Sequence, residues 1–190
     1  MEFTDDDCPE DVPRTATEIA RRALVLSAVL TAAYGASTDQ VLQWLETAEL
    51  KDEISPDELI LLEDPTNKAR RTDITWRIER LLILLWCIKK IARLPSLSDQ
   101  CDVDLLKAAI VFPPDPTAEY IASATLRSFV EIEEEREIVW QAHWTVRDAQ
   151  INDRELPYNL NPEIIYERHY AFNWVVGHMG QPWDEITTDT

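Results

Sequence analysis

Two long apolar stretches dominate the pattern of hydrophobic and polar positions: Ala23–Ala36 (ALVLSAVLTAAYGA) and Leu81–Ile88 (LLILLWCI). The first is shorter than the ~20 residues that span a bilayer and contains Ser27 and Thr31, so it predicts a buried helix. The second is apolar on every side, which by itself fits a buried strand or a buried helix. It lies in a stretch, 67–94, that has no Gly or Pro and ends with basic residues, so a helix is predicted. A helix that is apolar all round lies at the centre of its domain.

Sequence signals for helix starts divide the rest of the chain. Thr15–Glu18 (TATE) and Ser55–Glu58 (SPDE) have the pattern of capping boxes, and Asn161–Glu163 (NPE) places a cap before a proline. Helices are interrupted at Pro65, at Pro95 and in the FPPDP segment (Phe112–Pro116). The predicted helices cover about 15–34, 38–50, 55–62, 66–92, 103–111, a region after residue 116 that forms two helices or one bent helix, and 162–177.

The composition favours the same class. Three glycines in 190 residues are few for a fold that depends on tight hairpins. We therefore predict an all-α, single-domain bundle of about seven or eight helices, with buried central helices near 66–92 and 162–177. Residues 1–13 form a mobile acidic leader in this interpretation, and 14–190 form one helical domain.

The charge is strongly acidic, with 18 Lys and Arg against 36 Asp and Glu and a formal net charge of −18. Such a surface repels nucleic acids and anionic membranes and attracts a basic protein, although acidity can also serve solubility alone. Cys8, Cys87 and Cys101 form no CxxC pair and imply no disulfide framework. With an acidic start in place of a basic signal peptide, the chain is expected to be cytoplasmic.

Polar residues on apolar helix faces are the candidates for chemistry. Glu79 shares a face with Trp76, Ile83 and Trp86 by three- and four-residue spacing, and a carboxylate there requires a partner. Similar charges lie on the helices around Trp144 and Phe172. We expect these groups to pair with one another; the set is Glu79, Asp148 and Glu167 against Arg77, Arg147 and Arg168.

The sequence contains few signs of a catalytic or metal-binding motif, which gives little support for an enzyme. His169 and His178 are nine residues apart, on opposite sides of one helix, so they cannot chelate one ion from it. We find no nucleophile elbow, no phosphate-binding glycine loop and no carboxylate–histidine motif of a di-iron bundle. The sequence predicts no metal and no cofactor, and it leaves an enzyme as the less favoured reading. Trp140 and Trp144 are expected in the core, and Trp183 is expected to fold back and plug the bundle.

Four segments together resemble the DUF4272 family, a bacterial family of uncharacterised function. They are WRIERLLILLWCIKKIARLP (76–95), HWTVRDA (143–149), ERHYAFNW (167–174) and PWDEITTDT (182–190). The resemblance extends from about Arg22 to the last residue and makes the C-terminus part of the domain. The positions it implies are Trp76, Arg77, Glu79, Trp86, His143, Trp144, Arg147, Asp148, Glu167, Arg168, Asn173, Trp174, Trp183, Asp184, Thr188 and Asp189.

Three functional hypotheses follow. The first is a protein-binding module, of the immunity type if it neutralises a basic toxin domain. The alternative is an enzyme or small-molecule binder whose pocket contains Glu79, His143, Arg147 and Glu167; a purely structural role in a larger assembly is a third hypothesis. The full candidate pocket or buried polar network is Arg77, Glu79, His143, Trp144, Arg147, Asp148, Glu167, Arg168, His169, Asn173, Trp183 and Asp184.

Overall fold

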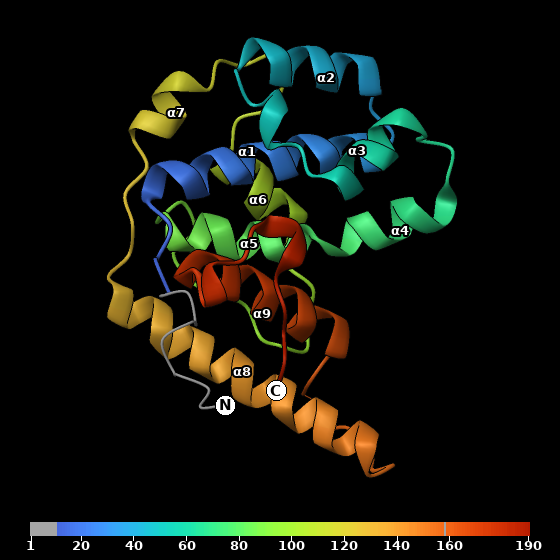
Figure 1. Ribbon diagram of the computed structural model, residues 1–190, viewed down its shortest axis with the longest axis vertical. Helices are drawn as coiled ribbons and strands as arrows, with labels where there is room; N and C mark the ends of the chain where they lie inside the picture. The colour runs from blue at the N-terminus through green and yellow to red at the C-terminus, as the bar shows by residue number, and fades with distance from the viewer. Residues whose placement is uncertain (1–10, 158) are drawn as a thin grey trace, which may run out of the picture.

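The computed structural model describes residues 11–157 and 159–190, and within these residues it contains helices and connecting segments but no strand. Figure 1 shows a stack in which α2 (Thr38–Thr47) covers α1 (Ala16–Ala33), and α1 lies on α5 (Ile78–Cys87). Beneath α5 lies α9 (Pro162–Val176), and α8 (Phe129–Ile151) closes the opposite side of the stack. The predicted all-α single-domain fold is confirmed, with its buried helices at the centre.

The N-terminal helices begin where the sequence predicts. Thr15 and Ser55 both form complete capping boxes, the latter at the start of α3 (Pro56–Glu63). The short 3₁₀ helix η2 (Lys51–Glu53) joins α2 to α3. Arg22 lies buried in α1, and its Nη2 donates to both carboxylate oxygens of Glu58, at 2.6 and 2.8 Å. The capping glutamate of α3 therefore also neutralises a charge inside the core.

The helix predicted over 66–92 is in fact two helices, α4 (Lys68–Trp76) and α5, separated at Arg77. Among its residues α4 buries only Ile74, whereas every residue of α5 is buried. The break lets α5 run through the core while α4 stays on the surface.

The predicted C-terminal end near Ala92 is also wrong, because α5 stops at Cys87 and Lys89 adopts a positive φ of 61°. Arg127 accounts for this end. Its guanidinium donates to the carbonyl oxygens of Trp86 and Ile91, at 2.8 and 2.9 Å. A side chain remote in sequence thereby bonds the Trp86 carbonyl near the helix end and the Ile91 carbonyl in the segment that follows.

The region after the FPPDP segment forms two separate helices, α7 (Ala118–Ala122) and α8, after the short α6 (Val103–Ala109). Ser128 and Glu131 form a capping box that begins α8. The buried residues of α8 recur at intervals of three, four and seven along the side that faces α9: Ile132, Val139, Ala142, His143, Val146 and Ala149. The opposite side of α8 is exposed.

The first described residues pack against the C-terminus of α9 and the turn that follows it. Gly177 ends α9 with a φ of 74°, and η3 (His178–Gly180) and η4 (Trp183–Glu185) then return across the bundle. The amide of Arg14 donates to the carbonyl oxygen of Val175 at 2.8 Å, and the amide of Met179 donates to Asp11 at 2.7 Å. Residues 1–10 of the predicted leader lie outside the described residues.

None of the helices that the structure describes has both the length and the apolar character needed to cross a bilayer.

Candidate functional site

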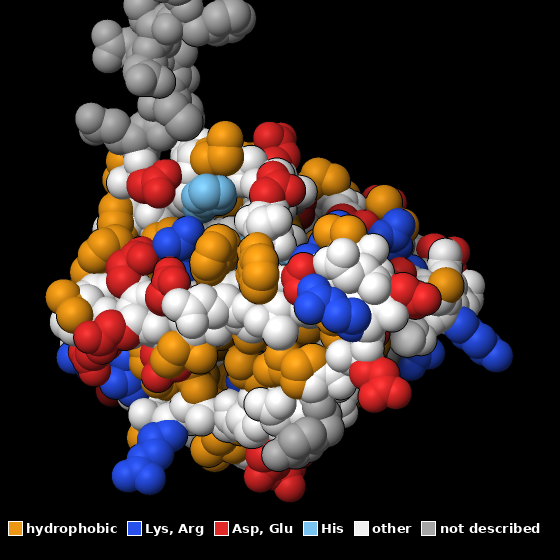
Figure 2. Space-filling model, turned by 90° about the horizontal axis from the view of Figure 1, so that it is seen from below, with side chains coloured by type: hydrophobic (Ala, Val, Ile, Leu, Met, Phe, Trp, Pro, Cys, Tyr) orange, Lys and Arg blue, Asp and Glu red, His pale blue; other side chains and the backbone are white. Residues whose placement is uncertain are grey.

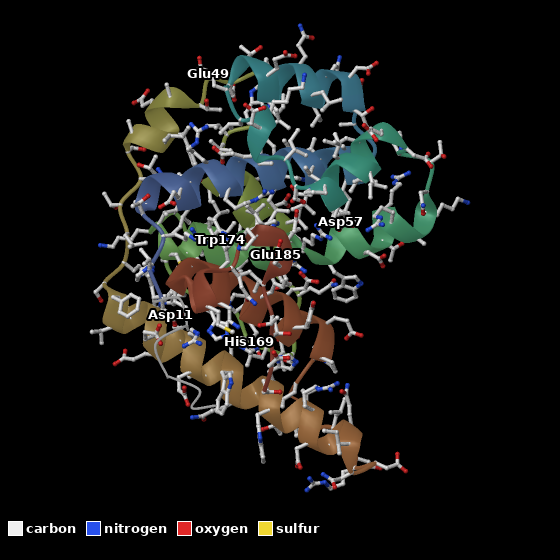
Figure 3. All side chains as sticks on the ribbon, in the orientation of Figure 1. Asp11, Glu49, Asp57, His169, Trp174 and Glu185 are labelled. Carbon is white, nitrogen blue, oxygen red and sulfur yellow. The ribbon has the colours of Figure 1, made fainter. Side chains whose placement is uncertain are left out.

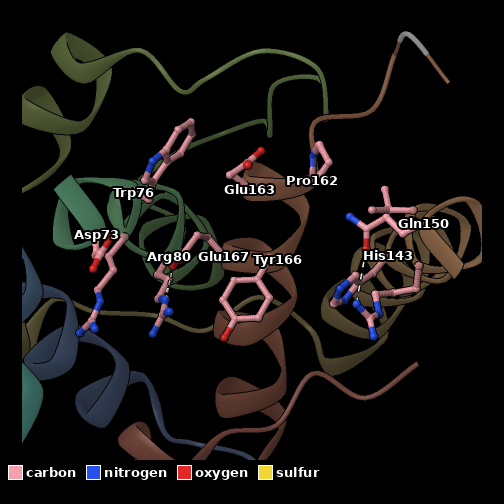
Figure 4. A pocket seen from close by; sticks show the side chains of 12 residues that line it. Asp73, Trp76, Arg80, His143, Gln150, Pro162, Glu163, Tyr166 and Glu167 are labelled. Carbon is pink, nitrogen blue, oxygen red and sulfur yellow. Dashed lines mark hydrogen bonds and ion pairs between the residues drawn. The ribbon is translucent and has the colours of Figure 1, made fainter. Parts of the chain in front are cut away.

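A polar pocket of about 480 Å³ opens where the α4–α5 junction, α8 and α9 approach one another. Figure 4 shows Asp73, Trp76 and Arg80 on one side, His143 and Gln150 on α8 opposite them, and Tyr166 between. The complete lining is Asp73, Trp76, Arg77, Arg80, His143, Val146, Arg147, Gln150, Pro162, Glu163, Tyr166 and Glu167. Four of the twelve residues of the candidate pocket or network, Arg77, His143, Arg147 and Glu167, therefore lie around one water-accessible pocket, together with Trp76.

At the floor of the pocket, Arg80 and Glu167 form a buried ion pair between α5 and α9. The Arg80 guanidinium also lies over the ring of Tyr170, 3.5 Å from its centroid. Burial is the largest single influence on the pKa of Arg80 and lowers it, but the charge of Glu167, its hydrogen bond and the two nearby tyrosines together raise the pKa above its ordinary value. The ion pair with Arg80 engages the Glu167 side chain, so this carboxyl group is not free to approach a ligand in the pocket.

Two histidines meet between α8 and α9, where His169 is labelled in Figure 3. The Nδ1 atoms of His143 and His169 lie 2.8 Å apart, so one ring donates a proton and the other accepts it. Burial, and then the charge of Arg147, lower the pKa of His143. Burial, and then His143, lower the pKa of His169 to about 3. Both rings are therefore neutral at pH 7, with complementary tautomers.

Two further arginines line the pocket, and they differ in whether they form an ion pair. Arg77 is paired with Asp57, which Arg70 also contacts. Arg147 has no ion-pair partner among the described residues, and its Nη1 donates only to the Gln150 side-chain oxygen, at 3.4 Å. Its guanidinium is therefore free to meet an anionic group in the pocket.

Glu79, by contrast, lies outside the pocket in a dry network. Its side chain is 0% exposed, and that of its partner Arg168 is 1% exposed. Glu79 Oε1 accepts from the Cys101 amide at 2.7 Å, and Oε2 accepts from Arg168 Nε at 2.9 Å. Arg168 Nη1 donates to the carbonyl oxygen of Pro95 at 2.8 Å. This group ties α5 and α9 to the segment that follows α5 and has no access to a ligand.

The expected pairing within one set of six charges is therefore wrong except for Glu79 with Arg168. Asp148 pairs with Arg154 at the end of α8, and Glu167 pairs with Arg80. Arg77 pairs with Asp57, and Arg147 donates to Gln150; neither partner belongs to the set. The grouping of Glu79 with His143, Arg147 and Glu167 in one pocket is wrong for Glu79.

The remaining candidates have separate positions. Trp144 is 51% exposed on the outer side of α8, so the expectation of a core tryptophan is wrong there. Asn173 accepts from Arg136 Nε at 3.1 Å and donates to the carbonyl oxygen of Thr187 at 2.9 Å, which attaches the C-terminal tail.

Trp183 is buried, as expected, with Arg22 over its ring at 4.6 Å from the centroid. Asp184 beside it is exposed.

Sequence reasoning missed Arg80 and Tyr166 in the pocket. Arg80 carried a usable signal, because it comes directly before an all-apolar helical run and would be buried with that run, and a buried guanidinium needs a carboxylate. Tyr166 carried none that separates it from other exposed aromatic residues.

The pocket is suited to binding polar groups. Among its described lining residues there is no Ser, Thr, Cys or Lys to act as a nucleophile. Within the described part of the chain, no group of three or more His, Cys, Asp or Glu side chains could hold a metal ion. The arrangement can hold a small anionic or zwitterionic molecule between arginines and carboxylates.

Comparison with known proteins identifies the family alone. A family model described as "Domain of unknown function (DUF4272)" matches residues 6–186. No curated protein and no solved structure matches the chain.

Proposed function

The chain belongs to the DUF4272 family, and from the outer face of α8 we propose that it is a protein-binding module whose partner presents a basic amphipathic helix. The proposal depends on one observation: a stripe of exposed side chains, interrupted only by the half-buried Asp148 that Arg154 pairs, along a helix that packs against the rest of the molecule on one side only.

The stripe follows alternating steps of four and three residues over the whole length of α8. It consists of Val130, Glu134, Glu137, Gln141, Trp144, Asp148 and Ile151, and we call it the α8 stripe. Val130 is 66% exposed and Ile151 is 74% exposed, so large apolar side chains stand at both ends. Figure 2 views the molecule from below, the side that α8 closes, and shows apolar side chains interspersed with carboxylates.

The spacing and the chemistry indicate the partner. A repeat of 3.5 residues is the one along which two helices pack side by side. Exposed tryptophan is typical of the centre of protein interfaces. Three residues of the stripe are carboxylates and none is basic, in a chain of net charge −18. A basic helix would gain both apolar contact and charge complementarity. A basic toxin domain has this chemistry, and the chain would then act as an immunity-type protein.

The experiment is affinity capture from the cells that produce the protein, at low salt, followed by identification and titration of the captured partner. We expect a stoichiometric basic protein whose affinity falls as salt rises. Glu134→Lys with Glu137→Lys should weaken binding at least tenfold, and Trp144→Ala should do so independently of salt.

The control carries the same change of charge at a distance from the stripe, Glu63→Lys on α3 with Glu46→Lys on α2, both exposed. It should lose far less affinity than the stripe variant. Equal losses in the two variants would mean that only the total charge matters, and the proposed surface would be wrong. A partner that binds regardless of salt and of Trp144 would also contradict the proposal.

A second candidate function rests on the free guanidinium of Arg147 in the polar pocket. The pocket would bind a small anionic or zwitterionic molecule. A molecule retained through gentle purification and lost in Arg147→Gln, but not in Arg154→Gln, would support this function.

A further inference from the structure

A second, larger cavity of about 740 Å³ lies among α1, α2, α5 and α6 and shares no lining residue with the polar pocket. The helix α6 supplies Val103, Leu106 and Lys107 to the lining and packs against α5. Most of the wall is apolar: Leu30, Val41, Ile78, Leu81, Val103, Leu106, Phe112 and Pro113. The volume is within the ~300–1,000 Å³ of sites that hold drug-sized ligands.

Ser27 places an unsatisfied hydroxyl in this wall. The residue is 2% exposed, and its Oγ has no hydrogen-bond partner among the described residues. Thr31, one turn further along α1, behaves differently, since its hydroxyl donates to the Ser27 carbonyl oxygen at 2.8 Å. A buried hydroxyl without a partner is unfavourable and rare in folded proteins. The Oγ is closed off in the wall as it stands, so the Ser27 side chain must turn about its Cα–Cβ bond to face the cavity, where a ligand with one suitably placed polar group would supply the missing hydrogen bond.

The charges around the cavity limit the class of ligand. Lys107 is the single charged side chain among the described lining residues, and it pairs with Asp104 at 3.4 Å in an exposed position. Tyr34 and Gln40, both exposed, provide neutral polar groups in the lining. A buried ionic group of a ligand would find no counter-charge inside, and the net charge of −18 opposes anions.

We propose that this cavity binds a small, uncharged, mainly apolar molecule that forms a single hydrogen bond with Ser27 Oγ. The apolar wall supplies the driving force through burial of the ligand's surface, and the hydroxyl fixes its orientation. This site is independent of the α8 stripe and of the polar pocket.

The first test is titration of the full chain with Nile red, a neutral apolar dye whose emission shifts in an apolar site. Val41→Phe extends a side chain from the wall of α2 into the cavity, and we expect dye affinity to fall at least tenfold. Ala122→Phe adds the same ring at an exposed position of α7 and should leave affinity unchanged. Melting curves verify that each variant folds.

The second test uses two matched competitors, naphthalene and 2-naphthol, which differ by one hydroxyl group. We expect 2-naphthol to displace the dye severalfold better than naphthalene, by up to about tenfold, because it alone can bond Ser27. Ser27→Ala should abolish this preference. It should also raise the melting temperature of the empty protein by roughly 2–4 °C, since an unpaired buried hydroxyl is removed.

Three results would overturn the proposal. The dye affinity could be the same in Val41→Phe and the wild type. The dye could instead be lost on Trp144→Ala, which would place it on the α8 stripe. The preference for 2-naphthol could persist in Ser27→Ala.

Discussion

Glu79 and Glu167 are both buried glutamates paired with arginine, yet they belong to different parts of the molecule. Glu79 is enclosed by Arg168 and the Cys101 amide, with no route to solvent. Glu167 forms its pair with Arg80 at the wall of a pocket. Replacing each should therefore have different consequences: Glu79 acts on stability alone, whereas Glu167 acts on stability and on any ligand of the pocket.

The first prediction concerns Glu79→Ala. We expect the free energy of unfolding to fall by roughly 3–5 kcal/mol, because Arg168 and the Cys101 amide would lose their partner inside the core. Urea unfolding measures this loss. Glu63→Ala, at an exposed position, should change the free energy by less than about 0.5 kcal/mol. A loss below about 0.5 kcal/mol for Glu79→Ala would contradict the buried pair.

The second prediction concerns the pH dependence that His169 imposes. The folded pKa is lowered to about 3, whereas an unfolded histidine titrates near 6.5. Between these values the unfolded chain binds a proton that the folded chain does not, so stability rises with pH and is fully present above about 6.5. Each histidine of this kind contributes at most about 1.4 kcal/mol per pH unit within this window.

Chemical unfolding at pH 7 and pH 5, compared between the wild type and variants, tests this dependence, because a change common to both chains cancels in the comparison. We expect His169→Asn to lose less stability between pH 7 and pH 5 than the wild type does, whatever its stability at pH 7. His178→Asn, at a half-buried position near the end of α9, serves as the control. An undiminished loss in His169→Asn would refute the role of the buried ring.

At the scale of the elements, local signals predicted helix starts well because caps act within four residues. Thr15, Ser55 and Asn161 begin their helices as the sequence indicates. The end of α5 could not be predicted in this way. Arg127, which lies 36 to 41 residues away in the sequence, bonds the Trp86 carbonyl of α5 and the Ile91 carbonyl in the segment after it. The separation of α4 from α5 at Arg77 likewise could not be predicted locally. It coincides with the change from an exposed helix to a buried one, and the sequence around Arg77 contains no Gly or Pro to indicate it.

The third prediction concerns the end of α9. Gly177 has a φ of 74°, and a Cβ there would overlap the backbone carbonyl of Val12. Gly177→Ala should therefore lose at least about 1–2 kcal/mol more than the left-handed conformation alone costs. Gly180→Ala is the matched control, with a left-handed φ of 65° at an exposed position. Equal losses of stability in the two variants would show that the N-terminal segment does not pack there.

The fourth prediction concerns the C-terminal tail. Deleting residues 182–190 removes the buried Trp183 and the carbonyl oxygens that Tyr170 and Asn173 bond. Loss of a buried tryptophan costs about 3–5 kcal/mol, so the melting temperature should fall by roughly 6 °C or more. Deleting only 188–190 keeps those groups and should shift it little. An unchanged melting curve after the longer deletion would show that the tail is not part of the fold.

At the scale of the whole molecule, fold class could be predicted because it follows from composition and patterning that every helix shares. The candidate site could be predicted only in part. Apolar faces identified which charges need partners, but the partners lie up to 89 residues apart in the sequence, as for Glu79 and Arg168. Which charges end in a dry network and which around a pocket depends on how three helices cross, so Glu79 was wrongly grouped with the pocket residues.

The distribution of surface chemistry is the other property of the whole molecule. One long helix covers one side of the stack and presents apolar and acidic residues outward, while the opposite half contains an apolar cavity. A partner on α8 and a ligand in the cavity would therefore occupy separate regions, each testable without disturbing the other.

The most direct measurement is native mass spectrometry of the protein isolated gently, at low salt, from the cells that produce it. The account predicts a stoichiometric complex with a basic protein, which is absent when Glu134→Lys, Glu137→Lys and Trp144→Ala are combined. A bare monomer from the wild-type protein under the same conditions would contradict the proposal that this chain is a protein-binding module.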